Sequence, residues 1–186
     1  MILSEKFFEQ PTVTVAKDLL GKYLVRKTAP TRSRSGQQSS RKISGMIVEV
    51  EAYDGFKDKA SHASRGLTKR NFPMFGPAGY WYVYFTYGMH WMLNIVTGKS
   101  GYPAAVLIRG VESGNRRING PARVTKYLKI DKRFNNKKAG KKTGLWIEDR
   151  DLKIKSLKLK VKSSPRIGIA HAGPVWSKKL YRFYIQ

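Results

Sequence analysis

Two extended runs joined by three residues occupy the middle of the chain. The first, residues 80–86, reads YWYVYFT, and the second, residues 90–96, reads HWMLNIV. Aromatic and β-branched residues favour strands, and a connection as short as Tyr87-Gly88-Met89 suits a hairpin, although it is not an Asn-Gly turn. The sequence therefore predicts a protruding antiparallel hairpin that carries Tyr87 at its tip.

Both faces of the first strand of this hairpin are bulky. Alternation along the strand gives one face Tyr80, Tyr82 and Tyr84 and the other face Trp81, Val83 and Phe85. A run as dense as this is more often part of a core than of a pocket. One face can nevertheless fill the core while the other lines a pocket, and the pattern leaves both interpretations open.

The remaining patterns predict more strands than helices. A helix is expected over 12–21 and another from Pro121, with Val124, Tyr127 and Leu128 facing inward; strands are expected over 23–27, 43–53 and 104–110. In residues 157–162 apolar residues alternate with lysines, which predicts a strand with one buried and one cationic face. Its lysines suit either a protected sheet edge or phosphate contacts.

The polar segment 29–42 is rich in Ser and Arg and has no hydrophobic periodicity. We expect a mobile surface loop that forms a hairpin insertion and does not separate two domains. With 186 residues, the whole chain 1–186 suits one domain. The expected fold is α+β: a single compact domain on a mainly antiparallel sheet with a few short helices.

The charge of the chain indicates a polyanionic partner. Lys and Arg number 37 against 12 Asp and Glu, and the formal net charge is +25. The cations are spread along the chain, so we expect the partner to contact the folded body. Anionic membranes also attract basic proteins, but the aromatic content of 12%, clustered in one stretch, suits nucleic acid bases better.

Several classes of protein are excluded or disfavoured by composition. The chain has no cysteine, which excludes disulfides, thiolate zinc sites and a cysteine nucleophile. Its 3 histidines are scattered, and we expect neither a metal site nor a cofactor. The apolar runs are too short to span a bilayer, and the N-terminus lacks the pattern of a signal peptide. We therefore expect a soluble, intracellular, monomeric protein with no membrane partner.

Acidic residues are rare, yet four fall within ten positions: Glu49, Glu51, Asp54 and Asp58. Alternation over 46–53 places Ile47 on the face of Glu49, Glu51 and Tyr53, and Met46, Val48, Val50 and Ala52 on the other. Unpaired carboxylates would weaken binding to phosphates. The cluster therefore suits either internal salt bridges to Arg and Lys or a general base held beside an aromatic platform for a nucleic acid base.

Six separated segments resemble the 3-methyladenine (alkyladenine, methylpurine) DNA glycosylase family. They are EVEAY at 49–53 followed by His62, YVYFTYGM at 82–89 followed by Asn94, AVLIR at 105–109, NGPAR at 119–123, RIGIAHAG at 166–173 and LYRFY at 180–184. The segments cover nearly the whole chain in order. The resemblance implies a monofunctional base-excision repair enzyme that acts on double-stranded DNA containing damaged purines.

The resemblance also implies roles in catalysis. Glu51 matches the family's general base, which deprotonates a water, and Arg109 matches the residue that helps to hold this water. The water would hydrolyse the N-glycosylic bond and leave an abasic site. The candidate bases are 3-methyladenine, 7-methylguanine, hypoxanthine and ethenoadenine, among which the sequence does not rank. The expected location is with DNA, in the cytoplasm or nucleoid of a bacterium or the nucleus of a eukaryote.

The same resemblance implies how the base is held. Tyr53, His62 and Tyr84 match the residues that sandwich the flipped base, and Asn94 matches a residue on the pocket floor. Tyr87 matches the side chain that enters the minor groove and fills the vacated stack, with Met89 beside it.

Two other functions remain open at this stage. A glycosylase/lyase would use a lysine amine to form a Schiff base and nick the strand, and a non-catalytic minor-groove or RNA-binding protein would share the basic and aromatic composition. His171 lies in a Gly-Ala context that favours a structural role over a catalytic one.

Overall fold

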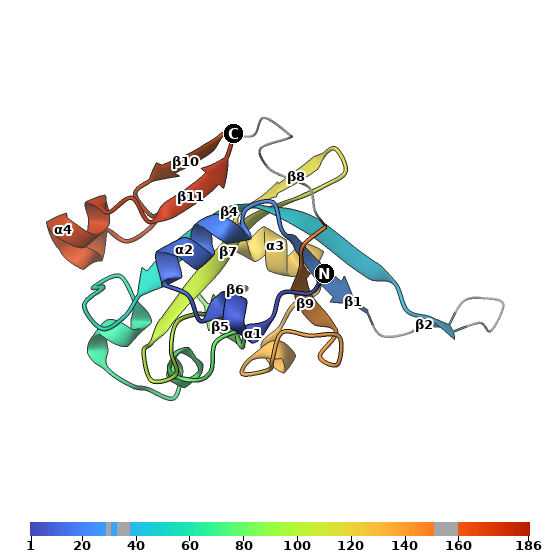
Figure 1. Cartoon of the computed structure of the whole chain (residues 1–186), viewed down its shortest axis with the longest axis horizontal. Helices are drawn as coiled ribbons and strands as arrows, with labels where there is room; N and C mark the ends of the chain where they lie inside the picture. Colours follow the sequence, from blue (N-terminus) through green and yellow to red (C-terminus); the bar gives the residue numbers. More distant parts are fainter. Residues whose placement is uncertain (29–30, 33–37, 151–159) are drawn as a thin grey trace.

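One antiparallel sheet of nine strands organises the molecule, which is described here from a computed structural model (Figure 1). The structure describes residues 1–28, 31–32, 38–150 and 160–186. The main path of the sheet runs β10-β11-β4-β7-β6-β5, while β1 pairs with β4 and β9, and β8 pairs with β7. Every paired register in it is antiparallel. The predicted α+β domain on a mainly antiparallel sheet is confirmed.

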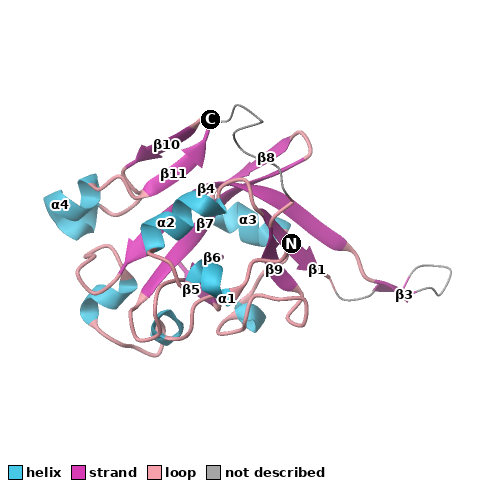
Figure 2. Cartoon of the chain, in the orientation of Figure 1, coloured by secondary structure: helices cyan, strands magenta, loops and turns pink. Residues whose placement is uncertain are grey.

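Short helices fill the connections between the strands (Figure 2). In chain order the elements are α1 (Glu5–Phe8), α2 (Thr12–Leu19), β1 (Tyr23–Lys27), β2 (Thr31–Arg32), β3 (Gln38–Ser39), β4 (Lys42–Asp54), the 3-10 helices η1 (His62–Arg65) and η2 (Phe72–Phe75), β5 (Trp81–Thr86), β6 (His90–Val96), β7 (Ala104–Ser113), β8 (Arg116–Asn119), α3 (Pro121–Tyr127), η3 (Lys132–Phe134), β9 (Leu145–Glu148), β10 (Val161–Ser164), η4 (Ala170–Ala172), α4 (Gly173–Lys178) and β11 (Arg182–Ile185).

The long strand β4 lies at the centre of the sheet and carries most of the clustered acids. It pairs with β1, β11 and β7, and its register with β7 shifts between Ile47 and Val50. Strict alternation placed Ile47 on the face of the acids, and this prediction is wrong. The irregularity at this point lets Ile47 join the main core beside Val48.

The main hydrophobic core joins the sheet to the helices. Helix α2 contributes Val15, Ala16 and Leu19, and α3 contributes Val124, followed by Leu128. Val124 and Leu128 were predicted to face inward, and so was Tyr127, which is only partly buried at the margin of the core. Gly21, with φ of 81°, follows α2 as the predicted helix stop, two residues after the last helical residue.

The aromatic hairpin consists of β5 and β6, as predicted, with Thr86 paired to His90 at its end. Trp81 and Val83 belong to the main core, whereas Tyr82 and Tyr84 belong to a separate cluster. The strand therefore fills the core with one face and contributes to a second apolar region with the other. Phe85, on the face of Trp81 and Val83, is 43% exposed and packs on Trp91, with ring centroids 4.6 Å apart.

Two of the predicted segments lie partly outside the described residues. Within 29–42 the strands β2 and β3 pair as a small separate hairpin, in keeping with an insertion, and its mobility stays a prediction. Of 157–162, the described part enters β10, which is at the edge of the sheet. The edge position agrees with one of the two interpretations of its lysines. The expected burial of Val161 is wrong, because the edge leaves its side chain 45% exposed.

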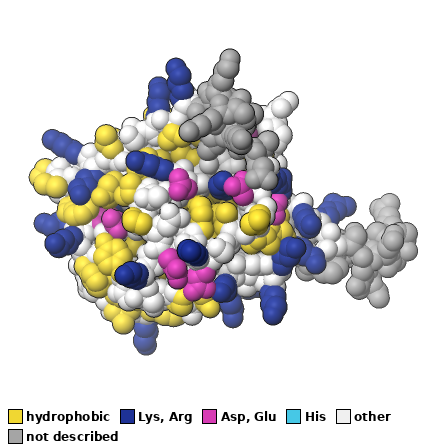
Figure 3. All heavy atoms as spheres, viewed as in Figure 1, with side chains coloured by type: hydrophobic (Ala, Val, Ile, Leu, Met, Phe, Trp, Pro, Cys, Tyr) yellow, Lys and Arg dark blue, Asp and Glu magenta, His cyan; other side chains and the backbone are white. Residues whose placement is uncertain are grey.

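Cationic side chains surround the face of the molecule drawn in Figure 3, and the few acidic groups lie between them. This distribution agrees with a polyanionic partner that contacts the folded body. Within the described ranges, no helix combines the length and the apolar character needed to cross a membrane.

Candidate active site

A cavity of about 330 Å³ opens between the aromatic hairpin, the loop that contains η1, and the segment before η4. Five of the residues expected to bind or process a base line it together: Tyr53, His62, Tyr84, Asn94 and Arg109. They come from β4, η1, β5, β6 and β7, so the cavity depends on chain segments that are far apart in sequence. Its volume and its wall of aromatic and aliphatic side chains suit a planar ligand of the size of a purine.

The aromatic wall is built around Tyr84. The ring of His62 meets it edge-on, with centroids 4.7 Å apart at 74°, and Tyr82 lies 5.2 Å away in a tilted arrangement. Burial raises the pKa of Tyr84 to about 12, so its phenol is neutral at ordinary pH. Arg70 lies against the ring of Tyr84 at 4.9 Å and donates to the carbonyl of Phe85 at 3.1 Å, which connects the wall to the loop before η2.

His62 is a neutral polar group in this wall. Burial lowers its pKa to about 4, and the positive charge of Arg70 and the proximity of His171 act in the same direction. Its Nδ1 lies 2.9 Å from the hydroxyl of Tyr82. Asn71 holds the loop behind it, because its side-chain amide donates to the carbonyls of His62 and Gly66 at 2.9 and 2.8 Å. The imidazole is thus held in one place and carries no charge at neutral pH.

Glu51 lies behind the cavity, and its side chain has no exposed surface. One carboxylate oxygen accepts the N–H of Ile167 at 2.7 Å, and the other accepts the hydroxyl of Tyr53 at 2.9 Å and faces Nη1 of Arg109 at 3.4 Å. Burial raises the pKa of Glu51, although Arg109 and the two hydrogen bonds oppose this effect. All three of its contacts come from residues that line the cavity.

Arg109 connects two of the clustered acids. Its Nε donates to Oε1 of Glu49 at 3.0 Å, and the same oxygen accepts Nε of Arg182 at 2.7 Å. Glu49 is therefore an internal salt-bridge partner, as one interpretation of the acidic cluster had it. Glu51 shares this network through Arg109, so the cluster combines ion pairs with a carboxylate placed beside an aromatic cavity.

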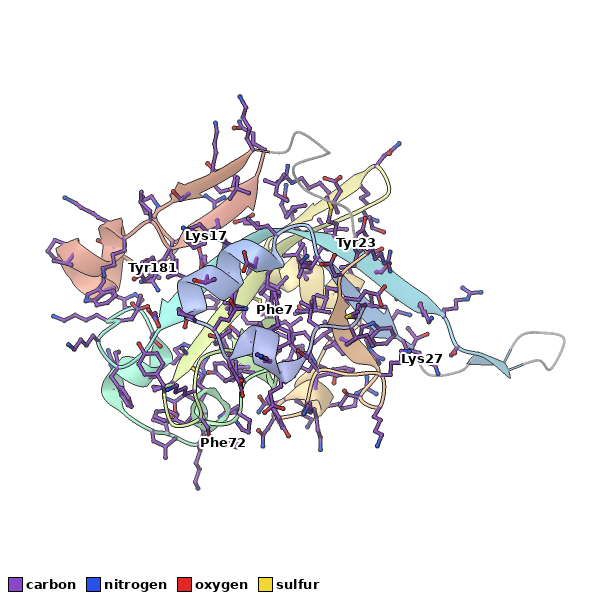
Figure 4. All side chains as sticks on the ribbon, in the orientation of Figure 1. Phe7, Lys17, Tyr23, Lys27, Phe72 and Tyr181 are labelled. Atoms are coloured by element: carbon purple, nitrogen blue, oxygen red, sulfur yellow. The ribbon has the colours of Figure 1, made fainter. Side chains whose placement is uncertain are left out.

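The last acid of the cluster, Asp58, forms a closed pair with Arg166 in which neither side chain has exposed surface. The two guanidinium N–H groups reach its oxygens at 2.5 and 2.8 Å, and Nη1 also donates to the carbonyl of Ala52 at 2.8 Å. The guanidinium stacks at 4.7 Å on the ring of Tyr53 and at 5.4 Å on that of Tyr181, which is labelled in Figure 4.

The sequence patterns predict no specific role for this pair, for Tyr82 or for the backbone N–H of Ile167. Asp58 was visible as a member of the acidic cluster, and Arg166 and Ile167 were visible as the start of the RIGIAHAG segment. Nothing in the spacing joins these two places, which are 108 residues apart.

Asn94 lies on β6, opposite Tyr82, and is buried. Its amide nitrogen donates to the carbonyl of Tyr82 at 3.1 Å, which fixes the orientation of the side chain in the cavity wall. His171, expected to be structural, also lines the cavity, at the end formed by residues 167–171.

The tip of the hairpin is much more exposed to solvent than the start of its strands. Tyr87 is 84% exposed and Met89 67% exposed, yet Tyr87 also reaches the rim of the cavity. Both Tyr87 and Gly88 have positive φ, 52° and 64°. A tyrosine rarely adopts this conformation, and residues held in it are often found at functional sites.

Comparison with known proteins agrees with the geometry. A family model described as methylpurine-DNA glycosylase (MPG) matches residues 6–186. The relatives named "Putative 3-methyladenine DNA glycosylase" include one from Legionella pneumophila (strain Corby), 41% identical over 187 residues that cover 99% of this chain and 94% of the relative. Another is from Ehrlichia chaffeensis, 40% identical with 99% and 93% coverage, and a third is from Methanocella arvoryzae, 38% identical with 98% and 92% coverage.

The family model matches nearly the entire chain, and these relatives are 38–41% identical to it, which is sufficient to assign the protein to a family. It is a DNA repair enzyme that hydrolyses N-glycosyl bonds, and the chain belongs to the methylpurine-DNA glycosylase family.

Proposed function

We propose that the enzyme rotates an alkylated or deaminated purine out of duplex DNA into the cavity and hydrolyses its N-glycosyl bond with a water activated by Glu51. The observation that carries this proposal is the buried carboxylate of Glu51, whose pKa is raised by burial and whose contacts are all with residues that line an aromatic cavity. A base with a pKa above that of an exposed carboxylate accepts a proton from water more readily.

The water would lie beside the contact between Glu51 and Arg109, within hydrogen-bond reach of both groups. At 3.4 Å, their contact is the longest of the three at Glu51, and Arg109 is already held by Glu49 at 3.0 Å. A water that bridges the two groups would therefore replace the weakest contact. Its oxygen would bond to C1′ of the sugar as the C1′–N bond breaks, its proton would pass to Glu51, and the base would leave with the bonding electrons.

The aromatic wall would supply the free energy that holds the extruded base. Stacking of a base on an aromatic side chain contributes about 1–3 kcal/mol, and extrusion costs a few kcal/mol, less when the pair is damaged. Tyr53, His62 and Tyr84 provide these surfaces. Because stacking does not distinguish purines, the buried and oriented amide of Asn94 is the group we expect to contact the base edge and discriminate among them.

The tip of the hairpin would fill the gap left in the duplex. Tyr87 is exposed, is held with positive φ and borders the cavity, so its ring can enter the DNA stack while the base occupies the cavity. Met89 would lie beside it against the minor groove. The proposed partner is double-stranded DNA bound by one copy of the chain, with phosphate contacts from its many cations.

The decisive experiment measures release of 3-methyladenine, 7-methylguanine, hypoxanthine and ethenoadenine from defined duplexes at one salt concentration. We expect Glu51→Gln to lower the single-turnover rate by about 10²–10⁴-fold while it still binds the duplex, because only the proton acceptor is removed. Glu9→Gln, which changes an exposed carboxylate on another part of the surface, is the matched control and should behave as wild type.

Each alternative mechanism predicts a different product. A lysine mechanism would nick the strand and allow trapping by borohydride, whereas hydrolysis leaves an intact strand with an abasic site. A non-catalytic binder would release no base at all. Full activity in Glu51→Gln, or a borohydride-trapped complex, would contradict the proposal.

A further inference from the structure

A second hollow adjoins the base cavity on the other side of Arg109. It has a volume of about 400 Å³ and shares Arg109 and Ile167 with the base cavity. The other residues that define its chemistry are Arg117, Arg182 and Glu49. Neighbouring strands supply these groups, β11 and β4 on one side and β7 and β8 on the other. We call it the arginine pocket.

Charge makes the arginine pocket suitable for an anion. It contains three guanidinium groups and one carboxylate, which leaves a net charge of +2 at neutral pH. Arg109 and Arg182 both donate through Nε to the same oxygen of Glu49. In the part of the chain that the structure describes, Arg117 has no carboxylate partner and is held by one bond to the carbonyl of Ile185, at 2.5 Å.

These contacts hold the guanidinium groups in place without using all their donors. Among the described residues, Arg109 and Arg182 each make their hydrogen bonds through Nε and Nη1, which leaves the Nη2 group of each available. Arginine presents its N–H groups in a planar fork that matches a phosphate, and groups already held in place lose little entropy when they bind one. The pocket is therefore preorganised for a small oxyanion.

Two glycines lie beside the residues that form the pocket. Gly110 lies on β7 next to Arg109, and a Cβ at this position would lie 3.1 Å from Cβ of Glu49 and 3.5 Å from its Oε2. A side chain would thus press on the carboxylate that organises two of the arginines. Gly120, where β8 ends, binds the carbonyl of Arg109 through its N–H at 2.8 Å and lines the same pocket.

We propose that the arginine pocket binds a phosphodiester next to the extruded nucleotide, with Arg117 as its dedicated contact. This inference rests on the proposed function. When the base is in the first cavity, its sugar must lie at the rim near Arg109 and Ile167, and the phosphates bonded to that sugar must lie to either side. The arginine pocket begins at these same two residues, and it carries the charge that a phosphate requires.

The pocket would consequently help to hold the nucleotide in its extruded position. A phosphate bound there fixes the sugar beside Glu51, which a contact to more distant DNA would not do. It would also bring a negative charge close to Arg109. Loss of Arg117 should therefore weaken binding of DNA with an extruded lesion more than binding of undamaged duplex, whereas a general phosphate contact would weaken both alike.

The test combines Arg117→Gln with removal of one phosphate charge. Duplexes with a single hypoxanthine or a stable abasic-site analogue carry a methylphosphonate, which is uncharged, on the 5′ or the 3′ side of the lesion. For one of these positions we expect wild type to lose about ten- to hundredfold in affinity, the range of a hydrogen bond to a charged group. Arg117→Gln should show this loss with the normal phosphate and no further loss with the methylphosphonate.

Arg116→Gln is the matched control, because Arg116 precedes Arg117 on β8, points to the other face of the strand and does not line the pocket. Its effect should add to that of the methylphosphonate, and thermal melting checks that each variant folds. The inference is overturned if Arg117→Gln binds as wild type, or if its effect adds fully to that of the methylphosphonate at both positions. Base release by wild type from the normal duplex tests the proposed function separately.

Discussion

Two buried acid–arginine pairs lie behind the aromatic cavity, and they differ in how completely they are closed. Asp58 and Arg166 have no exposed side-chain surface, and the oxygens of Asp58 also accept the N–H groups of Asp54 and Ala60 at 3.1 Å each. Glu51 is equally buried, but its arginine, Arg109, is 12% exposed and stands 3.4 Å away. The carboxylate of the first pair is satisfied within the protein, whereas the second pair faces a space where a ligand can enter.

The difference agrees with a structural role for the first pair and with the proposed catalytic role of the second. Asp58 is held by a bidentate guanidinium and by backbone N–H groups, an arrangement that leaves no position for a water. Burial raises the pKa of Glu51 despite its contacts, which means that its charge is incompletely compensated. The pairs are joined through the chain, because Ile167, which donates to Glu51, directly follows Arg166. The closed pair of Asp58 and Arg166 thus positions the N–H group that donates to Glu51.

Asp58→Asn should have the largest effect on stability. The substitution leaves the cation of Arg166 buried without a compensating charge, and breaking a buried pair in this way costs about 3–5 kcal/mol of unfolding free energy. Chemical denaturation monitored by tryptophan fluorescence measures this loss.

An exposed pair provides the control for that substitution. Asp131 pairs with Arg133, whose side chain is 71% exposed, so Asp131→Asn should change the unfolding free energy by no more than about 1 kcal/mol. Equal denaturation midpoints for the two variants would show that Asp58 and Arg166 are not the rigid pair described here.

The pair of Glu51 and Arg109, which faces the cavity, should instead affect the pH dependence of base release. Glu51 must be ionised to accept a proton, and burial raises its pKa above the ordinary 4.5. The single-turnover rate should therefore rise about tenfold per pH unit until that raised pKa is passed. His62 does not obscure this limb above pH 5, because its pKa is lowered to about 4. A rate that is constant from pH 4.5 upward would contradict the role of Glu51.

The sequence predicted the parts of the site that depend on local patterns. Alternation correctly separated Trp81 and Val83 from Tyr82 and Tyr84, but it left open which of the two faces fills the core. The resemblance to a known family pointed to residues in five elements. The structure brings these residues together around one cavity: Tyr53, His62, Tyr84, Asn94 and Arg109. Their catalytic roles stay predictions.

Contacts between distant segments could not be predicted in this way. The closed pair joins residues 108 positions apart, and no spacing rule relates them. The error at Ile47 has a different origin, since a register shift inside β4 breaks the period on which the prediction depended. Val161 was expected to be buried because its pattern alternates, yet the sheet edge lacks the second layer that would cover it.

Tyr53→Phe tests one contact of Glu51 and should have a smaller effect on base release. The substitution keeps the ring that stacks on Arg166 and removes only the hydroxyl that donates to Glu51 at 2.9 Å. Loss of one such hydrogen bond, about 0.5–1.5 kcal/mol, should change base release about 3- to 10-fold at pH 5–6. Because that bond lowers the pKa of Glu51, the acid limb should move to higher pH in the variant. An unchanged limb would place the hydroxyl outside the proton-transfer site.

The smallest expected effect has the opposite sign to that of Asp58→Asn. A carboxyl whose pKa is raised in the folded state stabilises the protein below the unfolded pKa, and this contribution is lost as pH rises through the folded pKa. Glu51→Gln removes that dependence, so its unfolding free energy relative to wild type should increase between pH 4 and pH 8. Denaturation curves at both pH values measure the difference. A variant less stable than wild type by the same amount at each pH would mean that Glu51, like Asp58, is a satisfied structural partner, and the distinction between the two pairs would fail.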